Sequence, residues 1–249
     1  MRKRLSSFLI TLGEMSLLFW QILIGVVRSP WRGKSILDQM VQIGINTLPV
    51  TSIMAIFTGM VLAVQTYHKF RQFELESWVG SVVATSVTRE LGPVLTAIVV
   101  AGRCGSSTAA ELGTMKVTEQ IDALKTLAVD PIRFLVIPRF LAAIVMLPLL
   151  TVFTDFVAIL GGYLMGVFRF GIRSSLYIDA TTNWLDPEDI LSGLTKALFF
   201  GIIIIVVSCQ RGLDAQGGAE GVGRATTSAV VISSIFILVS DYFLTLMLP

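Results

Sequence analysis

The chain has 249 residues, of which 54% are hydrophobic and only 14% are charged. A soluble domain normally carries about 25% charged residues, so the composition favours a polytopic membrane protein. The formal net charge of +2 is too small to indicate a nucleic-acid-binding surface. The two cysteines, Cys104 and Cys209, and the single histidine, His68, form no metal-ligand motif. Neither a disulfide framework nor a metal site is therefore expected.

The first apolar segment, residues 5–27, admits two interpretations: a sixth membrane span, or a helix lying along the cytoplasmic interface. A spanning helix would place one of its two flanking basic clusters on the wrong side of the membrane. The interfacial arrangement keeps both clusters inside, so we favour it for residues 1–34. No small-x-small cleavage site follows, and the segment is expected to be retained. The flanking basic residues are Arg2, Lys3, Arg4, Arg28, Arg32 and Lys34.

Five later runs are long enough to cross a bilayer, which takes about 20 apolar residues. They cover residues 43–65, 78–102, 140–167, 190–208 and 226–248. With an inside N-terminus, most of the basic residues between the runs fall inside, and only Lys69, Arg71, Arg169 and Arg173 fall outside. The positive-inside rule therefore predicts a cytoplasmic N-terminus and a C-terminus on the outer side.

Charged side chains interrupt the second run, where Arg89 and Glu90 lie near the middle. A charge at the centre of a span costs about 2.5–3.5 kcal/mol on insertion scales, so each needs a partner. Lys196 and Asp241 lie at similar depth on the fourth and fifth runs when residues are counted at about 1.5 Å each. We predict a polar cluster of these four residues. Two roles stay open: ion pairs that fix helix packing, or a charged contact for a polar substrate group or a gate.

The largest inside segment, residues 103–139, contains a predicted helix over residues 111–125 with an irregular apolar stripe. Asp130 precedes Pro131, and the residue before a proline avoids helical angles, so the helix should end before it. The pattern fits a loop helix packed on its own spans and a docking helix for a cytoplasmic partner equally well. The glycine-rich segment 212–223 lacks the lysine and Ser/Thr of a P-loop, so no nucleotide-hydrolysing site is expected in this chain.

Between the spans, several motifs occur in a fixed order. They are RELGP at 89–93, AGR at 101–103, AELG at 110–113, TEQ at 118–120, VDP at 129–131, PRF at 138–140 and RATT at 224–227. This order resembles the MlaE/YrbE family, the permease subunits of ABC transporters that move phospholipids between the membranes of diderm bacteria and, in a related form, of plastids. The resemblance runs from about residue 30 to the C-terminus. Cys104 departs from the family pattern, in which a small residue is more usual.

The resemblance implies an all-α integral membrane protein with five transmembrane helices, an N-terminal interfacial helix and a cytoplasmic coupling helix. The permease domain would cover residues 35–249, and the coupling helix, about 111–127, would seat in the groove of an ATPase subunit. It implies no catalytic residue in this chain. Arg89 and Glu90 match the family's buried charges by motif, and Lys196 and Asp241 match them by position. The coupling residues implied are Glu111, Met115, Lys116, Glu119, Gln120 and Asp122.

The resemblance also implies a location and partners. The location is the inner membrane of a diderm bacterium. The partners are a second copy of the chain, two ABC ATPase subunits that bind the ATP and Mg²⁺, a hexameric periplasmic MCE-domain protein and, in many systems, a STAS-domain subunit. Transport of phospholipid would maintain lipid traffic between the two membranes. A second hypothesis is an ion-coupled secondary transporter that uses intramembrane carboxylates.

A phospholipid needs a site with an apolar wall and a polar mouth. The predicted outer ends of the first and fifth runs supply apolar candidates. Packing within the bundle, or anchoring of aromatic rings at the membrane interface, is the alternative role for each of them. The candidates are Leu62, Tyr67, Phe70, Phe73, Phe243 and Leu246.

Overall fold

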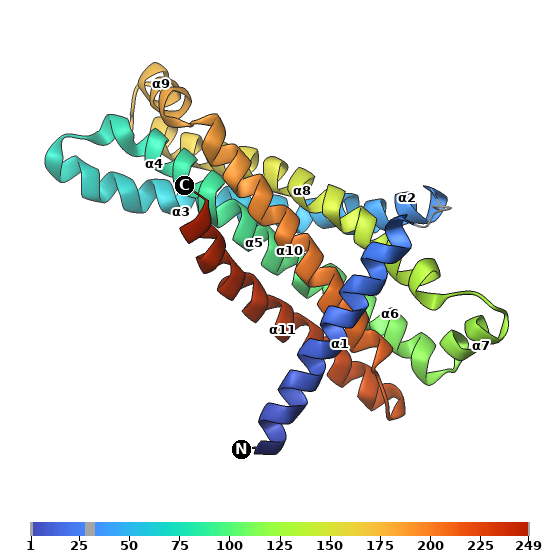
Figure 1. Cartoon of the computed structure of the whole chain (residues 1–249). Coiled ribbons are helices and arrows are strands. Elements are labelled where there is room, and N and C mark those ends of the chain that lie inside the picture. Colours follow the sequence, from blue (N-terminus) through green and yellow to red (C-terminus); the bar gives the residue numbers. More distant parts are fainter. Residues whose placement is uncertain (1, 28–32, 249) are drawn as a thin grey trace.

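The computed structural model describes the backbone of residues 2–27 and 33–248, and the side chains of residues 12–27 and 33–248. These residues form helices and contain no β-strand. Figure 1 shows long helices side by side, with α9 (Ser174–Trp184) at one end of the bundle and α7 (Gln120–Thr126) at the other. We call these the α9 end and the α7 end.

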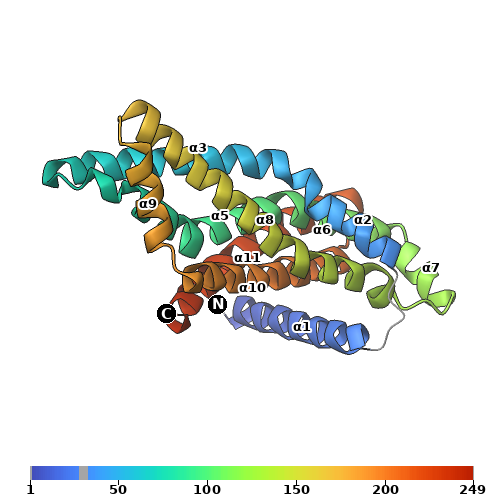
Figure 2. The same ribbon diagram turned by 90° about the horizontal axis from the view of Figure 1, so that it is seen from above.

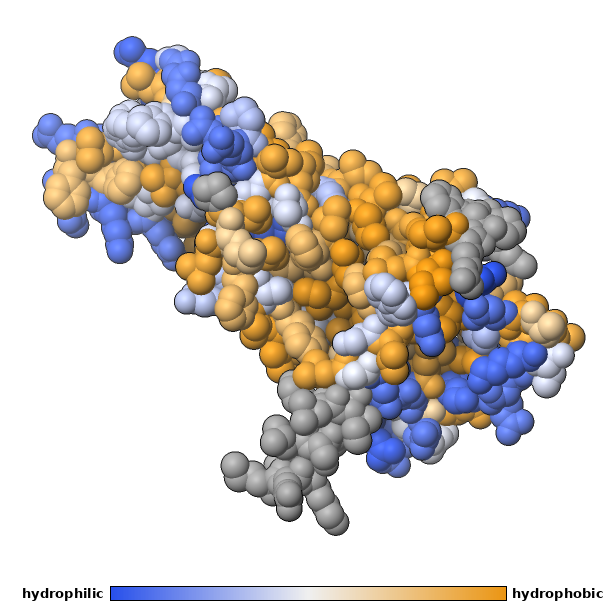
Figure 3. Space-filling model, in the orientation of Figure 1, coloured by the Kyte–Doolittle hydropathy of each residue, from blue (hydrophilic) through white to orange (hydrophobic). Residues whose placement is uncertain are grey.

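Five helical stretches are long and apolar enough to cross a membrane: Gly33–Phe73, Glu76–Val117, Ile132–Arg169, Pro187–Leu213 and Gly218–Met247. The predicted five-span all-α fold is therefore confirmed. Four of the stretches extend beyond both ends of their predicted apolar runs, and the fifth begins earlier, at Gly218, because polar turns continue the helix past the apolar part. The space-filling view shows a hydrophobic middle between two more hydrophilic ends, as expected for a bundle that lipid surrounds (Figure 3).

Short irregular segments interrupt three of the five stretches. The first contains α2 (Gly33–Ile43), η1 (Ile45–Thr47), α3 (Leu48–Phe70) and η2 (Arg71–Phe73). The second contains η3 (Glu76–Trp78), α4 (Val79–Ser86), η4 (Val87–Leu91), α5 (Gly92–Val100), η5 (Ala101–Gly105) and α6 (Ser106–Val117). The third contains η6 (Ile132–Val136), α8 (Ile137–Tyr163) and η7 (Leu164–Arg169). The fourth is α10 (Pro187–Leu213), and the fifth is α11 (Gly218–Met247).

Two glycines bring the backbones of α3 and α8 into direct contact. A Cβ atom on Gly59 would lie 1.8 Å from the carbonyl oxygen of Ala158, and one on Gly161 would lie 2.3 Å from that of Ile56. Small residues permit such close approach, which supplies much of the attraction between helices in lipid. The crossing therefore requires glycine on both helices.

Two other glycines of this region, Gly162 and Gly166, are one turn apart, a spacing suited to close packing. Both abut the buried ring of Tyr177, a residue of α9. Around this ring lies an apolar cluster that joins α3, α4, α8 and α9, and its rim includes the stacked rings of Tyr67 and Phe170, 4.0 Å apart. These contacts fix α9 on the ends of the spans.

The N-terminal helix α1 (Arg2–Val27) lies across α10 near the α7 end, rather than along it (Figures 1 and 2). Its residues Met15, Leu18 and Ile22 are buried in the larger apolar cluster of the bundle. A helix lying across the spans is the arrangement expected at an interface. Its position at the cytoplasmic surface stays a prediction, and Arg28 and Arg32 lie outside the described residues.

The predicted helix over residues 111–127 differs from the structure. The helix α6 begins earlier, at Ser106, and ends at Val117, and a separate helix α7 follows. Glu119 between them has a left-handed backbone, with φ of 61°. This conformation turns the chain so that Ile121 is buried while Glu119 and Gln120 stay exposed.

Candidate functional site

A wider turn of helix carries the charged pair of the second stretch. The residues Val87–Leu91 form a π-helical segment, η4, and Pro93 follows in the first turn of α5. Proline has no N–H, so it cannot donate the α-helical hydrogen bond to the carbonyl four residues earlier, that of Arg89. The carbonyl oxygen of Arg89 instead accepts a hydrogen bond from Nζ of Lys196 at 3.1 Å. The proline thus creates one acceptor of the site.

The close approach of α10 to η4 positions the partners. A Cβ atom on Gly193 would lie 2.1 Å from the carbonyl oxygen of Thr88, so only glycine fits there. Asp189 and Lys196 lie one turn before and one turn after Gly193, on the same helix face. The start of α10 is fixed by a capping box between Asp186 and Asp189.

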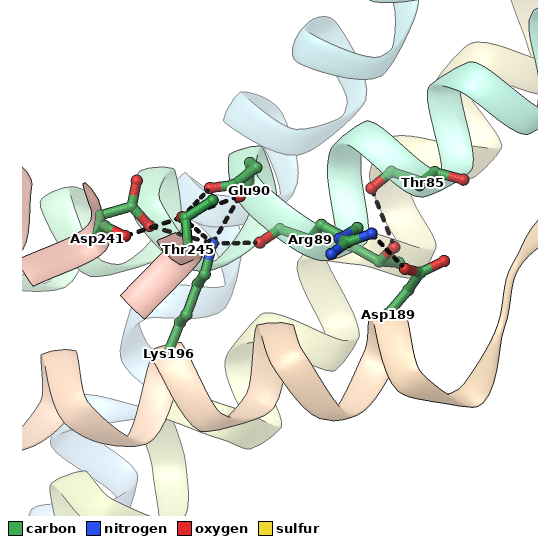
Figure 4. A network of polar contacts seen from close by, with 8 residues as sticks. Thr85, Arg89, Glu90, Asp189, Lys196, Asp241 and Thr245 are labelled. Carbon is green, nitrogen blue, oxygen red and sulfur yellow. Dashed lines mark hydrogen bonds and ion pairs between the residues drawn. The ribbon is translucent and has the colours of Figure 1, made fainter. Parts of the chain in front are cut away.

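Three polar side chains meet at the ammonium group of Lys196 (Figure 4). Its Nζ lies 2.7 Å from a carboxylate oxygen of Glu90 and 3.5 Å from one of Asp241. It also donates a hydrogen bond of 2.8 Å to the hydroxyl of Thr245. This hydroxyl lies 3.1 Å from Glu90. Lys196 therefore joins the second, fourth and fifth stretches through one charge.

The guanidinium of Arg89 points the other way, toward Asp189, with an ion pair of 3.3 Å (Figure 4). The predicted four-residue cluster is therefore divided: the structure brings Glu90, Lys196 and Asp241 together, while Arg89 contributes only its carbonyl. Neighbouring helical residues point about 100° apart, which accounts for the divergence. We call Arg89, Glu90, Asp189, Lys196, Asp241 and Thr245 the charge network.

The charge network is closed on one side and open on the other. The side chain of Lys196 is 1% exposed, whereas that of Glu90 is 38% exposed. The carboxylate of Glu90 can therefore meet a molecule outside the chain while its cation stays buried. Asp189 and Thr245 were missed as members, because one reads as a helix cap and the other as an ordinary threonine of an apolar helix.

A further carboxyl group within the spans was also missed. Asp155 of α8 lies against Gly92, two residues after Glu90, since a Cβ on that glycine would lie 1.7 Å from Oδ1 of Asp155. Among the described residues, no hydrogen-bond donor reaches this oxygen, which is buried. The signal in the sequence was a single acidic residue inside an apolar run.

The predicted lipid-contacting residues fall into two groups. Leu62, Tyr67 and Phe70 are partly buried in the apolar cluster at the α9 end. Phe73, Phe243 and Leu246 have more than half of their surface exposed. Figure 2 shows α5 and α8 between α3 and α11, so the two helices that carry the candidates are apart within one chain. A single copy does not bring the six residues together.

The predicted coupling residues lie at the α7 end. Asp122 forms ion pairs with Lys116 and Lys125, and the hydrogen bond from Lys125 is the main reason that its pKa is lowered. Glu119 and Gln120 are exposed, whereas Met115 packs against the apolar core. Glu111 lies on the preceding helix and pairs with Arg139 of α8. The exposed residues of this set are therefore Glu119 and Gln120 at the turn before α7, together with Glu111 on α6.

A polar contact at the α7 end joins α1 to α10. The buried amide of Gln210 lies 3.1 Å from the carboxylate of Glu14 and also donates to Asp214. Burial raises the pKa of Asp214, and the neighbouring Glu14 carboxylate adds to this effect, while Arg211 and Lys116 oppose it. The two acidic side chains, one on α1 and one just after α10, face the same amide.

We expect the contact between α1 and α10 to weaken as the pH rises. A raised pKa means that the folded protein keeps the Asp214 proton at a pH where the unfolded chain has lost it. The stabilisation is complete below the unfolded pKa and is lost as the pH rises through the folded pKa. Hydrogen exchange of α1 amides, corrected for intrinsic rates, should accelerate over this range. Asp214→Asn should flatten the dependence, and an unchanged profile would contradict the assignment.

Comparison with known proteins gives consistent matches over nearly the whole chain. The family model described as "Permease MlaE" matches residues 36–247. A "Probable ABC transporter permease protein" of Rickettsia felis is 47% identical over 243 residues, covering 98% of this chain and 94% of its own length. A probable ABC transporter permease protein of Synechocystis is 40% identical over 225 residues, covering 90% and 86%. The chloroplastic protein TRIGALACTOSYLDIACYLGLYCEROL 1 of Arabidopsis thaliana is 39% identical over 225 residues, covering 90% and 64%.

Proposed function

The chain belongs to the MlaE family of ABC transporter permeases, and from this premise we propose that it moves phospholipids between the inner and outer membranes of a diderm bacterium. ATP hydrolysis on a partner subunit drives the movement. The plant relative supports a lipid substrate, because its name contains that of a glycerolipid. In this proposal the α7 end faces the cytoplasm and the α9 end faces the periplasm.

The observation that carries the proposal is the half-open charge network beside an exposed apolar surface. Glu90 is more than a third exposed, and Phe243 and Leu246 project from the same end of α11 that supplies Thr245. A phospholipid combines a charged headgroup with apolar tails, so this combination of surfaces suits it. The apolar surface would contact the tails, and the network would lie near the headgroup.

A second copy of the chain would complete the lipid site. The apolar candidates on α3 and α11 lie apart within one chain, so a pocket that uses both sets needs residues from two chains. A homodimer provides this arrangement through a closed two-fold interface. A periplasmic MCE-domain protein at the α9 end would continue the lipid path, and a STAS-domain subunit would bind at the α7 end.

The helix α7 is the proposed contact for the ATPase, which would bind the ATP and Mg²⁺. It is short, exposed on its Glu119 and Gln120 side and fixed on the other side by the buried Ile121. A short helix held in this way transmits a push from a bound partner to the spans. An ion-coupled transporter is the second candidate. The buried Oδ1 of Asp155, which no donor among the described residues reaches, favours it, since such carriers use carboxylates within the spans.

The test is to purify the tagged chain from its native membrane and measure the ATPase that accompanies it. Asp122→Lys reverses the charge on α7 and should reduce recovery of the ATPase about tenfold, the effect of about 1.4 kcal/mol in binding. Glu220→Lys is the matched control, because Glu220 lies at the same end and is exposed. Recovery should stay unchanged in this control.

The wild-type assembly in vesicles should transfer a fluorescent phospholipid only when ATP is supplied. Transfer that follows a proton or sodium gradient without ATP would favour the ion-coupled alternative. A wild-type chain that recovers no ATPase would reject the proposed function.

A further inference from the structure

Arg139 is a buried cation near the start of α8, and it lies outside the charge network. Its side chain is only 4% exposed, and its guanidinium lies 2.7 Å from a carboxylate oxygen of Glu111. The same guanidinium donates to the carbonyl of Leu135 in η6. Burial of an arginine is costly unless a partner compensates it, so Glu111 is needed to hold this charge in place.

The partner residue lies on α6, which continues directly toward the exposed helix α7. Close packing holds α6 against two other helices: a Cβ on Gly212 of α10 would lie 2.7 Å from Leu112, and one on Gly113 would lie 3.5 Å from Val222 of α11. These are contacts between small or apolar groups. Among the described residues, the ion pair with Arg139 is the polar contact between α6 and α8.

At its other end, α6 continues through η5 and α5 to η4, which carries Arg89 and Glu90. A displacement of α7 would therefore reach the charge network along the second stretch. It would reach α8, which crosses α3 at Gly59 and Gly161, at two places. One is α5, where Thr96 and Thr154 share a hydrogen bond of 2.7 Å, and the other is the Arg139–Glu111 pair at the α7 end. A displacement of α6 can therefore pass along the second stretch toward the charge network, and through the Arg139–Glu111 pair to α8.

We propose that Arg139 and Glu111 link α6 to the start of α8, so that this end of α8 moves together with the second stretch when the ATPase displaces α7. Arg139 is a positioning residue in this role, because its buried side chain acts through Glu111. The proposal rests on the proposed function, since it presupposes an ATPase bound at α7. Without the pair, ATP hydrolysis continues in the partner subunit, but less of the displacement reaches α3 and α8.

The experiment measures phospholipid transfer and ATP hydrolysis in the same vesicles that contain the complete assembly. In Glu111→Gln and in Arg139→Gln, the lipid transferred per ATP hydrolysed should fall about tenfold, the change produced by losing about 1.4 kcal/mol of coupling. The exchanged pair, Glu111→Arg with Arg139→Glu, should restore most of the ratio. Glu220→Gln serves as the control, because it removes an exposed pair with Arg224 at the same end, and it should leave the ratio unchanged.

Three results would overturn the inference. One is an unchanged ratio in Glu111→Gln, and another is a ratio that stays low in the exchanged pair. A Glu111→Gln chain that fails to assemble would show that the pair serves stability instead. Each of these outcomes leaves the proposed function intact if the wild-type assembly transfers lipid with ATP. If the wild-type assembly transfers none, the proposed function itself has failed.

Discussion

Replacing Lys196 with methionine is expected to lower the free energy of unfolding by about 3–5 kcal/mol, the effect of removing one partner from a buried ion pair. The side chain is 1% exposed and holds Glu90 at 2.7 Å and Asp241 at 3.5 Å. Its loss leaves two carboxylates close together in a region of low dielectric, without a cation between them. Reversible unfolding of the purified protein in mixed micelles measures the change.

The neutral triple variant, Glu90→Gln with Lys196→Met and Asp241→Asn, separates charge from shape. It should recover most of the lost stability, because neutral groups that replace a complete buried ion cluster often cost nothing. Lys125→Met, at an exposed position on α7, is the matched control and should change stability little. A loss in the triple variant as large as in Lys196→Met would show that the charges are not the cause.

The same variants address the open question about the charge network, namely whether it only fixes the helices or also meets the lipid. Glu90 is 38% exposed, so we expect it to do both. A triple variant that regains stability should therefore still fail to transfer phospholipid. The exchange Glu90→Lys with Lys196→Glu should likewise fold without transfer. Recovery of transfer together with stability would assign the network to packing alone.

The sequence predicted those features that depend on local pattern. Apolar length predicted the five stretches, and counting depth along them predicted that Glu90, Lys196 and Asp241 approach one another. Counting depth placed the guanidinium of Arg89 in the same cluster, but it pairs with Asp189 instead. The π-helical turn of η4 and the close approach at Gly193 decide where Arg89 points. These are properties of two packed helices, and neither segment shows them alone.

Other parts of the site depend on contacts between residues far apart in the chain. Asp155 is a single acidic residue in an apolar run, and only its position against Gly92 reveals a carboxyl group in the interior. Glu111 reads as one more charge of an exposed helix, and only the fold places it beside Arg139. The break between α6 and α7 depends on the left-handed backbone of Glu119, a conformation that a glutamate rarely adopts.

The crossing of α3 and α8 should be the other point at which a single change has a large effect. In Gly59→Ala, the added Cβ would lie 1.8 Å from a backbone oxygen of Ala158, whereas ordinary contacts begin at 3.4 Å. The carbonyl cannot rotate away without breaking its own helix, so the two helices must separate. We expect a loss of about 1–3 kcal/mol from overpacking, and more with leucine at this position. Reversible unfolding in mixed micelles measures the loss.

Gly161→Ala should cost a similar amount, because its Cβ would meet the carbonyl of Ile56 on the same crossing. The double variant should cost less than the sum of the two, since one separation of the helices relieves both clashes. Gly102→Ala is the matched control: its Cβ meets nothing within 4 Å, so alanine should be neutral or stabilising there. Strict additivity would mean that the clashes are relieved separately, and the crossing would then not act as one rigid contact. In that case a push on α8 would not reach α3 as a unit, and movement at the α7 end would be lost before it reached the stacked rings of Tyr67 and Phe170.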